Sequence, residues 1–405
     1  MQTSTPEPFV PPPRVSQLPV LAAGFAIYLF GNVWPSVILV SAIFLSFFIP
    51  YCFRTTDHPE VRRRLYREYE KTKHPMIQKV LAIPDYVDLT EKYWINSRGM
   101  ALCTAVLKPK GRREPKGVVF FCHGFGDHVS FMKRYNMFNF VREGIAVATI
   151  EYEGHGRSDG PLGLIPDFDQ LVDDAVDYFK EVSEQHFPGK KCFLMGEVRC
   201  SSFKHTSLIH THMLRVTFSL NQSMGGAVAF LAYKKQPSLF HGVIFVAPMC
   251  KILDALKPPQ WVIDLLSKLI GPNGTNGFLG YLPIAPTRAD FDQLANKDVI
   301  MKDLCKSTPF LDDRTPRLTT ARELLRAASR VSSELDSFDA PFLVQHGLAD
   351  KITDPKLSQA LYDEAKSEDK TIKLYEGMYH AMMADVPSET AMVLNDCIQW
   401  VLKRV

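Results

Sequence analysis

Seven short apolar runs, separated by segments of helical periodicity, constrain the fold of this chain more than any other feature. They are ALCTAVLKP (101–109), GVVFFCHG (117–124), IAVATIEYEG (145–154), CFLMG (192–196), GVIFVAP (242–248), PFLVQHG (341–347) and TIKLYEG (371–377). Helices are expected between them, at 130–143, 168–186, 224–236, 355–367 and 387–403. Strands rich in Val, Ile and Phe that alternate with helices are typical of a mostly parallel sheet with helices on both faces. We therefore predict an α/β fold.

The alternation stops between about residues 250 and 335, where no convincing strand occurs. We expect 249–335 to form a helical cap inserted late in the sheet, between a first core part at 91–248 and a second at 336–405. In an open α/β sheet such an insertion lies over the strand ends, where ligands bind. Trp261 and the apolar residues after it could line an acyl-binding cleft or could be ordinary contacts between cap and core.

The N-terminal region contains a long stretch without charge. No Asp, Glu, Lys or Arg occurs from Val15 to Phe53, and this exceeds the roughly 20 residues that span a bilayer. We expect a disordered tail at 1–16, a hydrophobic membrane segment at 17–53, as one span or a hairpin, and a charged linker helix at 54–90. A buried hairpin in a soluble protein and a removed targeting peptide are the alternatives.

Five arginines follow the hydrophobic segment, and only Arg14 precedes it. They are Arg54, Arg62, Arg63, Arg64 and Arg67. Because positive charge is enriched on the cytoplasmic side of a membrane segment, we expect the catalytic domain to face the cytoplasm. The expected location is the endoplasmic reticulum or another endomembrane.

Composition excludes several other classes of function. The formal charge of +3, without long blocks of either sign, gives no indication of a nucleic-acid partner. The eight cysteines are widely spaced and lack a C-x-x-C pair, which favours reduced, buried thiols over disulfides. Because no His, Cys and carboxylate cluster has zinc spacing outside 198–222, we expect no metal and no cofactor.

A serine followed by two glycines opens the helix expected at 224–236. The strand that should deliver it, CFLMG, ends at Gly196-Glu197, whereas Ser223-Met224-Gly225-Gly226 begins 26 positions after Glu197. Without residues 198–222 the sequence would read G-E-S-M-G-G, a complete G-x-S-x-G motif. That motif forms a strained turn that presents a nucleophilic serine. Ser223 is therefore the candidate nucleophile, and it needs partners elsewhere in the chain.

The 25 residues from 198 to 222 interrupt this motif. They contain no Asp, Glu, Gly or Pro, and their three histidines lack a fourth metal ligand. Val198-Arg199 can be encoded by GTA-AGR and Asn221-Gln222 by AAY-CAG, the preferred ends of a spliceosomal intron. We interpret 198–222 as a retained intron or a gene-prediction error, with a genuine surface insertion as the alternative. A further alternative is that 214–220 replaces 192–196 as the central strand.

A nucleophilic serine needs a histidine base and an acid that orients it, in the chain order Ser, Asp, His for this architecture. Asp350 lies in the loop after PFLVQHG, and His380 lies in the loop after TIKLYEG. Asp354 is the rival acid, but it directly precedes Pro355 and a helix, so a helix N-cap explains it more simply. We therefore predict Asp350 as the acid and His380 as the base.

The oxyanion of such a reaction needs backbone N–H donors. We expect one from Met224, the residue after the nucleophile. The other is expected from Phe125, in the loop after GVVFFCHG, where Gly124 turns the chain and Gly126 permits a close approach. A loop that only joins strand to helix is the alternative.

Together these motifs resemble the monoacylglycerol lipase family of α/β-hydrolases, in particular its plant caffeoylshikimate esterase-like branch with a serine aminopeptidase S33-type domain. The resemblance covers about residues 90–405. It is carried by HGFGDH (123–128), GHGRSDG (154–160), the split GE and SMGG, VAPMCKI (246–252), HGLADKITDP (346–355) and LYEGMYH (374–380). It implies the α/β-hydrolase fold, Ser223, Asp350 and His380 as the triad, a cap over an ester site, and a structural role for the turn at Asp159.

The expected function is a membrane-attached serine hydrolase that cleaves monoacylglycerol or related carboxylic esters through an acyl-enzyme. Its partners would be a lipid or ester substrate and the membrane. Because an elbow requires its strand and serine to be adjacent, the insert could impair this isoform. A catalytically inactive binding protein of the same fold and an acyltransferase with the same triad are the alternatives.

Overall fold

The computed structural model describes residues 52–71, 82–111, 114–128, 132–197, 224–248, 278–283, 294–306 and 314–405, with six isolated positions (46, 49, 78, 264, 268 and 285). The chain divides into two compact units, residues 1–57 and 58–405. Most of the expected membrane segment at 17–53 lies outside the described residues, as do Trp261, Ser223 and all of 198–222. Within the described part of the chain, none of the helices combines the length and the apolar character that crossing a bilayer requires.

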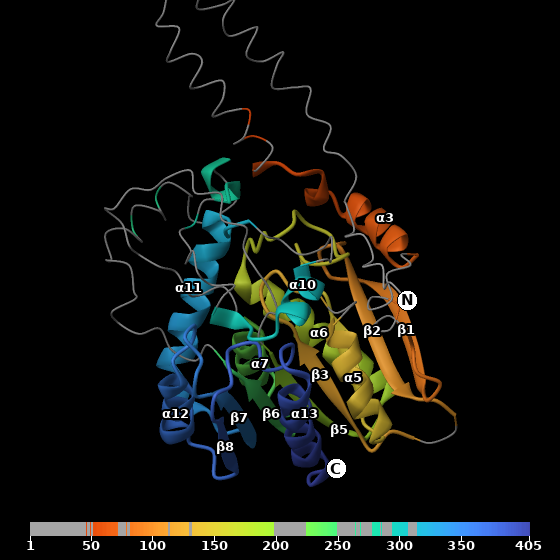
Figure 1. Cartoon of the computed structure of the whole chain (residues 1–405), viewed down its shortest axis with the longest axis vertical. Coiled ribbons are helices and arrows are strands. Elements are labelled where there is room, and N and C mark those ends of the chain that lie inside the picture. The colour runs from red at the N-terminus through yellow and green to blue at the C-terminus, as the bar shows by residue number, and fades with distance from the viewer. Residues whose placement is uncertain are drawn as a thin grey trace, which may run out of the picture. The chain divides into compact units, whose positions relative to one another are not determined.

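A sheet of eight strands forms the centre of the second unit (Figure 1). The strands are β1 (Val87–Ile95), β2 (Ala101–Pro109), β3 (Gly117–Cys122), β4 (Ala146–Ile150), β5 (Lys191–Gly196), β6 (Gly242–Val246), β7 (Phe342–Gly347) and β8 (Lys370–Tyr375). Their order is β1-β2-β4-β3-β5-β6-β7-β8. β2 is antiparallel to both of its neighbours, and every other pairing is parallel. The predicted mostly parallel sheet is confirmed.

Residues 192–196, which precede the insert, belong to the central strand β5. β5 pairs with β3 through Cys122 and Gly196 and with β6 through Phe245 and Gly196. The alternative in which residues 214–220 take the place of 192–196 is therefore wrong. The run Cys192 to Met195 is wholly apolar, and both faces of a central parallel strand are covered, so burial favours this strand.

Helices cover both faces of the sheet. The helices described after β3 are α5 (Met132–Arg142), α6 (Phe168–His186), α7 (Met224–Lys235), α10 (Val299–Lys306), α11 (Leu318–Ser333), α12 (Pro355–Glu364) and α13 (Pro387–Leu402), with short 3-10 turns η3 (Phe278–Tyr281) and η4 (Leu335–Ser337). Helices α5 and α13 contribute to the core on one face, and α6, α7 and α12 contribute to the core on the other. The five helices expected from the sequence are all present, with ends that agree within three residues.

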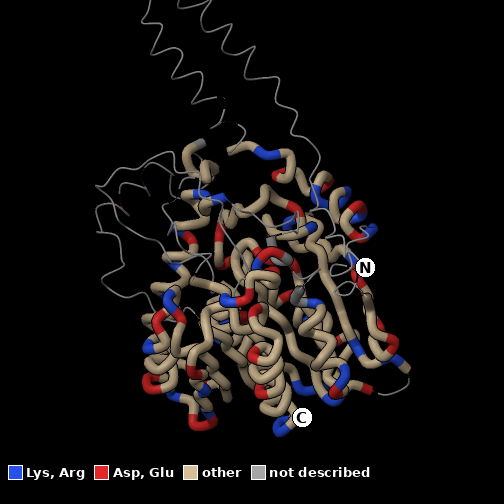
Figure 2. The backbone as a smooth tube through the Cα atoms, in the orientation of Figure 1, with Lys and Arg blue, Asp and Glu red and all other residues tan. Residues whose placement is uncertain are grey.

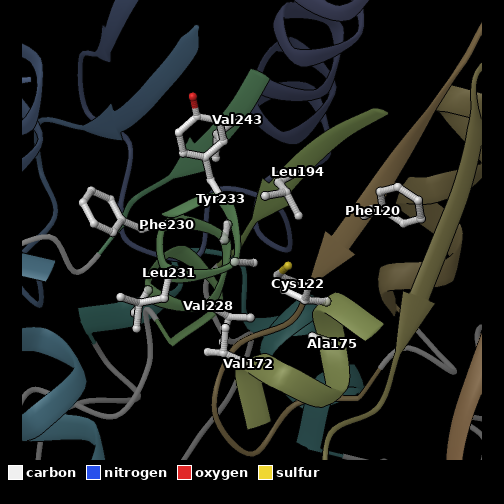
Figure 3. Packing of buried hydrophobic residues seen from close by; sticks show 14 of the residues in the cluster. Phe120, Cys122, Val172, Ala175, Leu194, Val228, Phe230, Leu231, Tyr233 and Val243 are labelled. Carbon is white, nitrogen blue, oxygen red and sulfur yellow. The ribbon is translucent and has the colours of Figure 1, made fainter. Parts of the chain in front are cut away.

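Alternate residues of each central strand enter two separate cores. On β3, Phe120 and Cys122 pack with residues of α6 and α7, such as Ala175 and Val228 (Figure 3). Val119 and Phe121 instead join the cluster that contains residues of α5 and α13. Because successive side chains of a strand point to opposite faces, an apolar strand serves both cores. Charged residues of both signs are interspersed on the surrounding elements (Figure 2).

The region expected as a linker helix at 54–90 contains two different elements. Helix α3 (Pro59–Tyr69) occupies its first part, and strand β1 begins at Val87. β1 is an edge strand whose residues are mostly exposed or half-buried, so it lacks the apolar run by which the other strands were recognised. The short turn η1 (Thr55–Asp57) belongs to the first unit.

Helix α3 is fixed to the sheet unit by its arginines. The guanidinium of Arg62, which is fully buried, donates hydrogen bonds to the carbonyl oxygens of Gly156, Ser158 and Gly160 at 2.6, 2.5 and 2.9 Å. Arg63 forms an ion pair with Asp159 at 2.7 Å. Two of the five arginines from which the membrane orientation was predicted are therefore held by contacts within the sheet unit.

Candidate active site

Five parallel strands bring the candidate site residues to one edge of the sheet. β3, β5, β6, β7 and β8 run in the same direction, so the loops that follow them begin at the same edge. The loop after β3 carries Phe125, the loop after β7 carries Asp350, and the loop after β8 carries His380. In open parallel sheets this edge is where ligands bind.

The end of β5 lies directly against the start of α7. A Cβ atom added at Gly196 would be 2.5 Å from the carbonyl oxygen of Gly225 and 2.7 Å from the Cα of Gly226. A Cβ at Gly225 would be 2.5 Å from the carbonyl oxygen of Glu197. Only glycine permits such close backbone contact. The end of the strand and the start of the helix in the interrupted motif are therefore in close backbone contact.

Asp350 and His380 form a buried pair. The Nδ1 atom of His380 is 2.6 Å from Oδ2 of Asp350, and both side chains are fully buried. The two loops also share backbone hydrogen bonds, from Leu348 N–H to Tyr375 and from Ala349 N–H to Met378. Because Nδ1 faces the carboxylate, Nε2 is on the opposite side of the ring. This is the orientation in which an acid orients a histidine base.

The Asp350 carboxylate accepts several further hydrogen bonds. The backbone N–H groups of Ile352 and Thr353 donate to Oδ1 at 2.7 and 3.0 Å, and the Thr353 hydroxyl donates to Oδ2 at 2.8 Å. Burial by itself would raise the pKa of Asp350, but the attraction of His380 and the hydrogen bonds from His346 and His380 outweigh it and hold the pKa well below its usual range. Asp350 is therefore ionised at neutral pH.

His346 is a site residue that the sequence did not reveal. Its Nε2 lies 3.0 Å from Oδ2 of Asp350, and its Nδ1 lies 2.7 Å from Oγ of Ser358 on α12. A histidine before a glycine at a strand end was the available signal, but its contact with Asp350 depends on how the following loop turns. Asp354, the rival acid, accepts from Lys356 N–H at 2.9 Å as the N-cap of α12.

Phe125 is buried in the loop after β3, where Gly126 has a φ of +67°. Nδ1 of the nearby His123 donates to the Gly124 carbonyl at 2.9 Å, and its Nε2 accepts the Tyr152 N–H at 3.2 Å. Since a carbonyl only accepts, Nδ1 carries the proton. Burial lowers the pKa of His123 to about 4, so the ring is neutral at pH 7.

The loop that contains Gly154 to Gly160 supports the Phe125 loop. The His155 ring contacts the Phe125 ring edge-on at 5.6 Å between centroids, and the His123 ring stacks on Tyr152 at 4.1 Å. Arg62 binds three carbonyls of this loop from the other side. Helix α3 is thereby connected, through the loop, to the segment expected to bind the oxyanion.

Described parts of the expected cap contact the histidine loop and the loop before α6. The N–H of Ala381, next to His380, donates to the Ala295 carbonyl at 3.0 Å. Thr320 on α11 accepts the Ile165 N–H at 2.9 Å. Among the residues whose placement is described, no group of three or more His, Cys, Asp or Glu could hold a metal ion.

The structure thus brings Asp350 and His380 together, and it places Met224 at the first position of α7 and Phe125 in the loop after β3. The candidate nucleophile Ser223 lies outside the described residues. Its neighbours in sequence, Met224 and Gly225, are buried in the first turn of the helix.

Comparisons with known proteins show which sequences this chain resembles. The family model described as Serine aminopeptidase, S33 matches residues 113–198 and 202–387. Caffeoylshikimate esterase of Arabidopsis thaliana is 31% identical over 295 residues, which cover 72% of this chain and 79% of that protein. Monoglyceride lipase of Mus musculus is 28% identical, over 79% of this chain and 92% of that protein.

Solved structures show the same fold. A soluble variant of monoglyceride lipase from Saccharomyces cerevisiae, solved in complex with a substrate analog, superposes with a TM-score of 0.59 at 21% identity. The alignment covers 79% of this chain and 96% of that one. A monoacylglycerol lipase from Paleococcus ferrophilus gives a TM-score of 0.54 at 22% identity and covers 75% of this chain and 99% of that one.

Proposed function

The chain belongs to the serine aminopeptidase S33 family of α/β-hydrolases, and from this premise we propose that it hydrolyses monoacylglycerols or related carboxylic esters. Its relatives include caffeoylshikimate esterase and monoglyceride lipases, which act on carboxylic esters. These names support the class of reaction.

In the proposed mechanism Ser223 is the nucleophile. The Nε2 atom of His380 removes the proton of the Ser223 hydroxyl as Oγ attacks the ester carbonyl carbon, and His380 then protonates the leaving alcohol. The acyl-enzyme is cleaved when water attacks it with His380 again as base. Asp350 keeps Nδ1 of His380 protonated and stabilises the imidazolium, and the N–H groups of Phe125 and Met224 bind the oxyanion.

One observation carries this proposal: Oδ2 of Asp350 and Nδ1 of His380 lie 2.6 Å apart, with both side chains fully buried. The pair occupies the loops after β7 and β8, at the sheet edge where the end of β5 contacts the start of α7. An isolated buried carboxylate would be costly. The pairing of Asp350 with His380 at this edge supports the proposal that His380 is held in place as a catalytic base.

We further propose that residues 17–53 attach the enzyme to a membrane of the endoplasmic reticulum or another endomembrane, with the sheet unit on the cytoplasmic side. The support is the absence of charge from Val15 to Phe53 and the exposed basic residues Arg64 and Arg67 that follow. A membrane-held hydrolase would meet acyl esters where they partition. The sequence motifs of the hydrolase do not depend on this segment.

The insert at 198–222 separates Glu197 from Ser223, and we propose that it reduces activity. Catalytic groups tolerate only small misplacement, because an error of about 1 Å can cost on the order of a hundredfold in rate. The close contact between Gly196 and Gly225 supports the idea that strand and helix are already positioned for an elbow. Deleting residues 198–222 would then restore the motif without rebuilding its surroundings.

A fluorophosphonate probe, together with hydrolysis of a monoacylglycerol, tests the proposal. The full chain and a variant lacking 198–222 would be compared, each with Ser223→Ala as its control. We expect the shorter form to be labelled and active, the full chain to be much weaker, and Ser223→Ala to abolish labelling in both. A folded shorter form that is neither labelled nor active would contradict the proposal and favour a catalytically inactive binding protein.

A further inference from the structure

The structure places a second histidine on the carboxylate that orients the catalytic base. Oδ2 of Asp350 lies 2.6 Å from Nδ1 of His380 and 3.0 Å from Nε2 of His346. His346 is fully buried at the end of β7, and His380 follows β8. One carboxylate oxygen therefore bridges two imidazole rings that come from adjacent strands.

The neighbours of His346 determine which of its nitrogens carries a proton. Nε2 faces two acceptors, Oδ2 of Asp350 and the carbonyl oxygen of Thr353 at 3.1 Å, and it also lies 3.3 Å from the Thr353 hydroxyl, which donates to Asp350. An unprotonated nitrogen there would place a lone pair against two oxygens, so Nε2 carries the proton. The other nitrogen, Nδ1, meets the Ser358 hydroxyl at 2.7 Å, a group that can donate or accept.

The contacts of His346 fit an uncharged ring. The one negative charge of Asp350 already faces His380 at 2.6 Å, so a second positive charge buried beside it would lack a carboxylate of its own. In the neutral form Nδ1 accepts a hydrogen bond from the Ser358 hydroxyl, which is itself fully buried. A positively charged His346 would instead compete with the imidazolium that forms on His380 during catalysis.

We propose that His346 is a positioning residue: a neutral imidazole, fixed by Ser358, whose Nε2–H holds the Asp350 carboxylate in place for His380. The proposal rests on the proposed roles of Asp350 and His380. The Thr353 hydroxyl contributes to the same arrangement, since it donates to Oδ2 of Asp350 at 2.8 Å and lies 3.1 Å from Nδ1 of His380. The titratable groups that act most strongly on Asp350 are these two histidines.

Two replacements separate a positioning role from a packing role. His346→Gln keeps an N–H donor close to the position of Nε2, whereas His346→Leu removes it. Without the donor the Asp350 carboxylate is less neutralised and attracts a proton on the His380 ring more strongly. We expect kcat/KM of His346→Leu to fall by about ten- to a hundredfold and its acid limb to move up by about one pH unit.

These kinetics would be measured on the active shorter form, with the exposed His186→Leu as a matched control. We expect His346→Gln to keep most of the activity and an acid limb close to that of the parent. An acid limb that stays in place in His346→Leu, or a loss of activity no larger than in the control, would overturn the proposal.

Nitrogen NMR of protein labelled with ¹⁵N-histidine gives a readout that does not depend on activity. The His346 signals, assigned by their loss in His346→Gln, are expected to show a proton on Nε2 and none on Nδ1. Ser358→Ala should weaken this preference. A charged ring or a proton on Nδ1 alone would overturn the proposal, and this holds even if no ester is hydrolysed and the proposed function itself fails.

Discussion

Gly196 and Gly225 lie in direct backbone contact, although 28 residues separate them in the chain. A Cβ at Gly196 would approach the carbonyl oxygen of Gly225 to 2.5 Å. The contact joins the last residue of β5 to the first turn of α7, and it brings together the two halves of G-E-S-M-G-G. The end of β5 and the start of α7, which flank the proposed nucleophile in sequence, are therefore in close contact in a chain that contains the insert.

The first prediction concerns this contact. In Gly225→Ala the new methyl group would meet the backbone of Cys122 and Glu197, neither of which can rotate away. We expect a loss of about 2 kcal/mol or more in the free energy of unfolding and loss of fluorophosphonate labelling. Urea unfolding and labelling of the shorter form would measure both.

Gly189→Ala is the matched control for this glycine. It has a φ of +71°, but a Cβ there would meet no atom within 4 Å. We expect a loss of only about 1 kcal/mol from backbone strain, with labelling unchanged. If Gly225→Ala behaves like Gly189→Ala, the contact does not constrain the turn.

The second prediction concerns acid sensitivity. Burial lowers the pKa of His123 to about 4 from an ordinary value of 6.5. Between these values the unfolded chain binds a proton that the folded chain does not, so stability is fully present above pH 6.5 and is lost as the pH falls toward 4. The lowered pKa of His123 contributes about 3 kcal/mol to the free energy of unfolding when this effect is fully present.

His123→Asn should remove most of this dependence while keeping a donor for the Gly124 carbonyl. Urea unfolding at pH 7 and pH 4.5 would show a smaller loss than in the parent chain. Some loss remains, because burial also lowers the pKa of His128. The exposed His241→Asn should lose as much stability as the parent, and an undiminished loss in His123→Asn would contradict the prediction.

The third prediction concerns helix α3. Arg62→Met removes the donor from three carbonyl oxygens, of which those of Gly156 and Ser158 are in buried hydrogen bonds and that of Gly160 is in a partly buried one. We expect a loss of at least about 3 kcal/mol in the free energy of unfolding. Thermal unfolding of Arg62→Met and of Arg64→Met, an exposed residue on the same helix, gives the comparison. Equal stability of the two variants would show that α3 is only a connecting helix.

Local patterns in the sequence were enough to predict the layered architecture, because each central strand and each covering helix carries one. The apolar runs at 117–124, 145–154 and 242–248 contain buried parallel strands, and α6 has the predicted bounds. The chain order of Asp350 and His380 also followed from the positions of their strands. Such features depend on residues that are close in sequence, so periodicity and turn residues are enough to find them.

The relationships between distant segments, by contrast, depend on the folded chain. Strand β1, which is mostly exposed, pairs with β2, and Lys191–Gly196 forms a strand of the sheet. Arg62, which the sequence suggested as a charge beside a membrane segment, is a buried hydrogen-bond donor. The fold also places His346 against Asp350. In each case the determining contacts are hydrogen bonds or packing that form only when the chain is folded. The hydrogen-bond partner of a buried polar group is therefore found from the folded structure, because the spacing of residues in the sequence does not specify it.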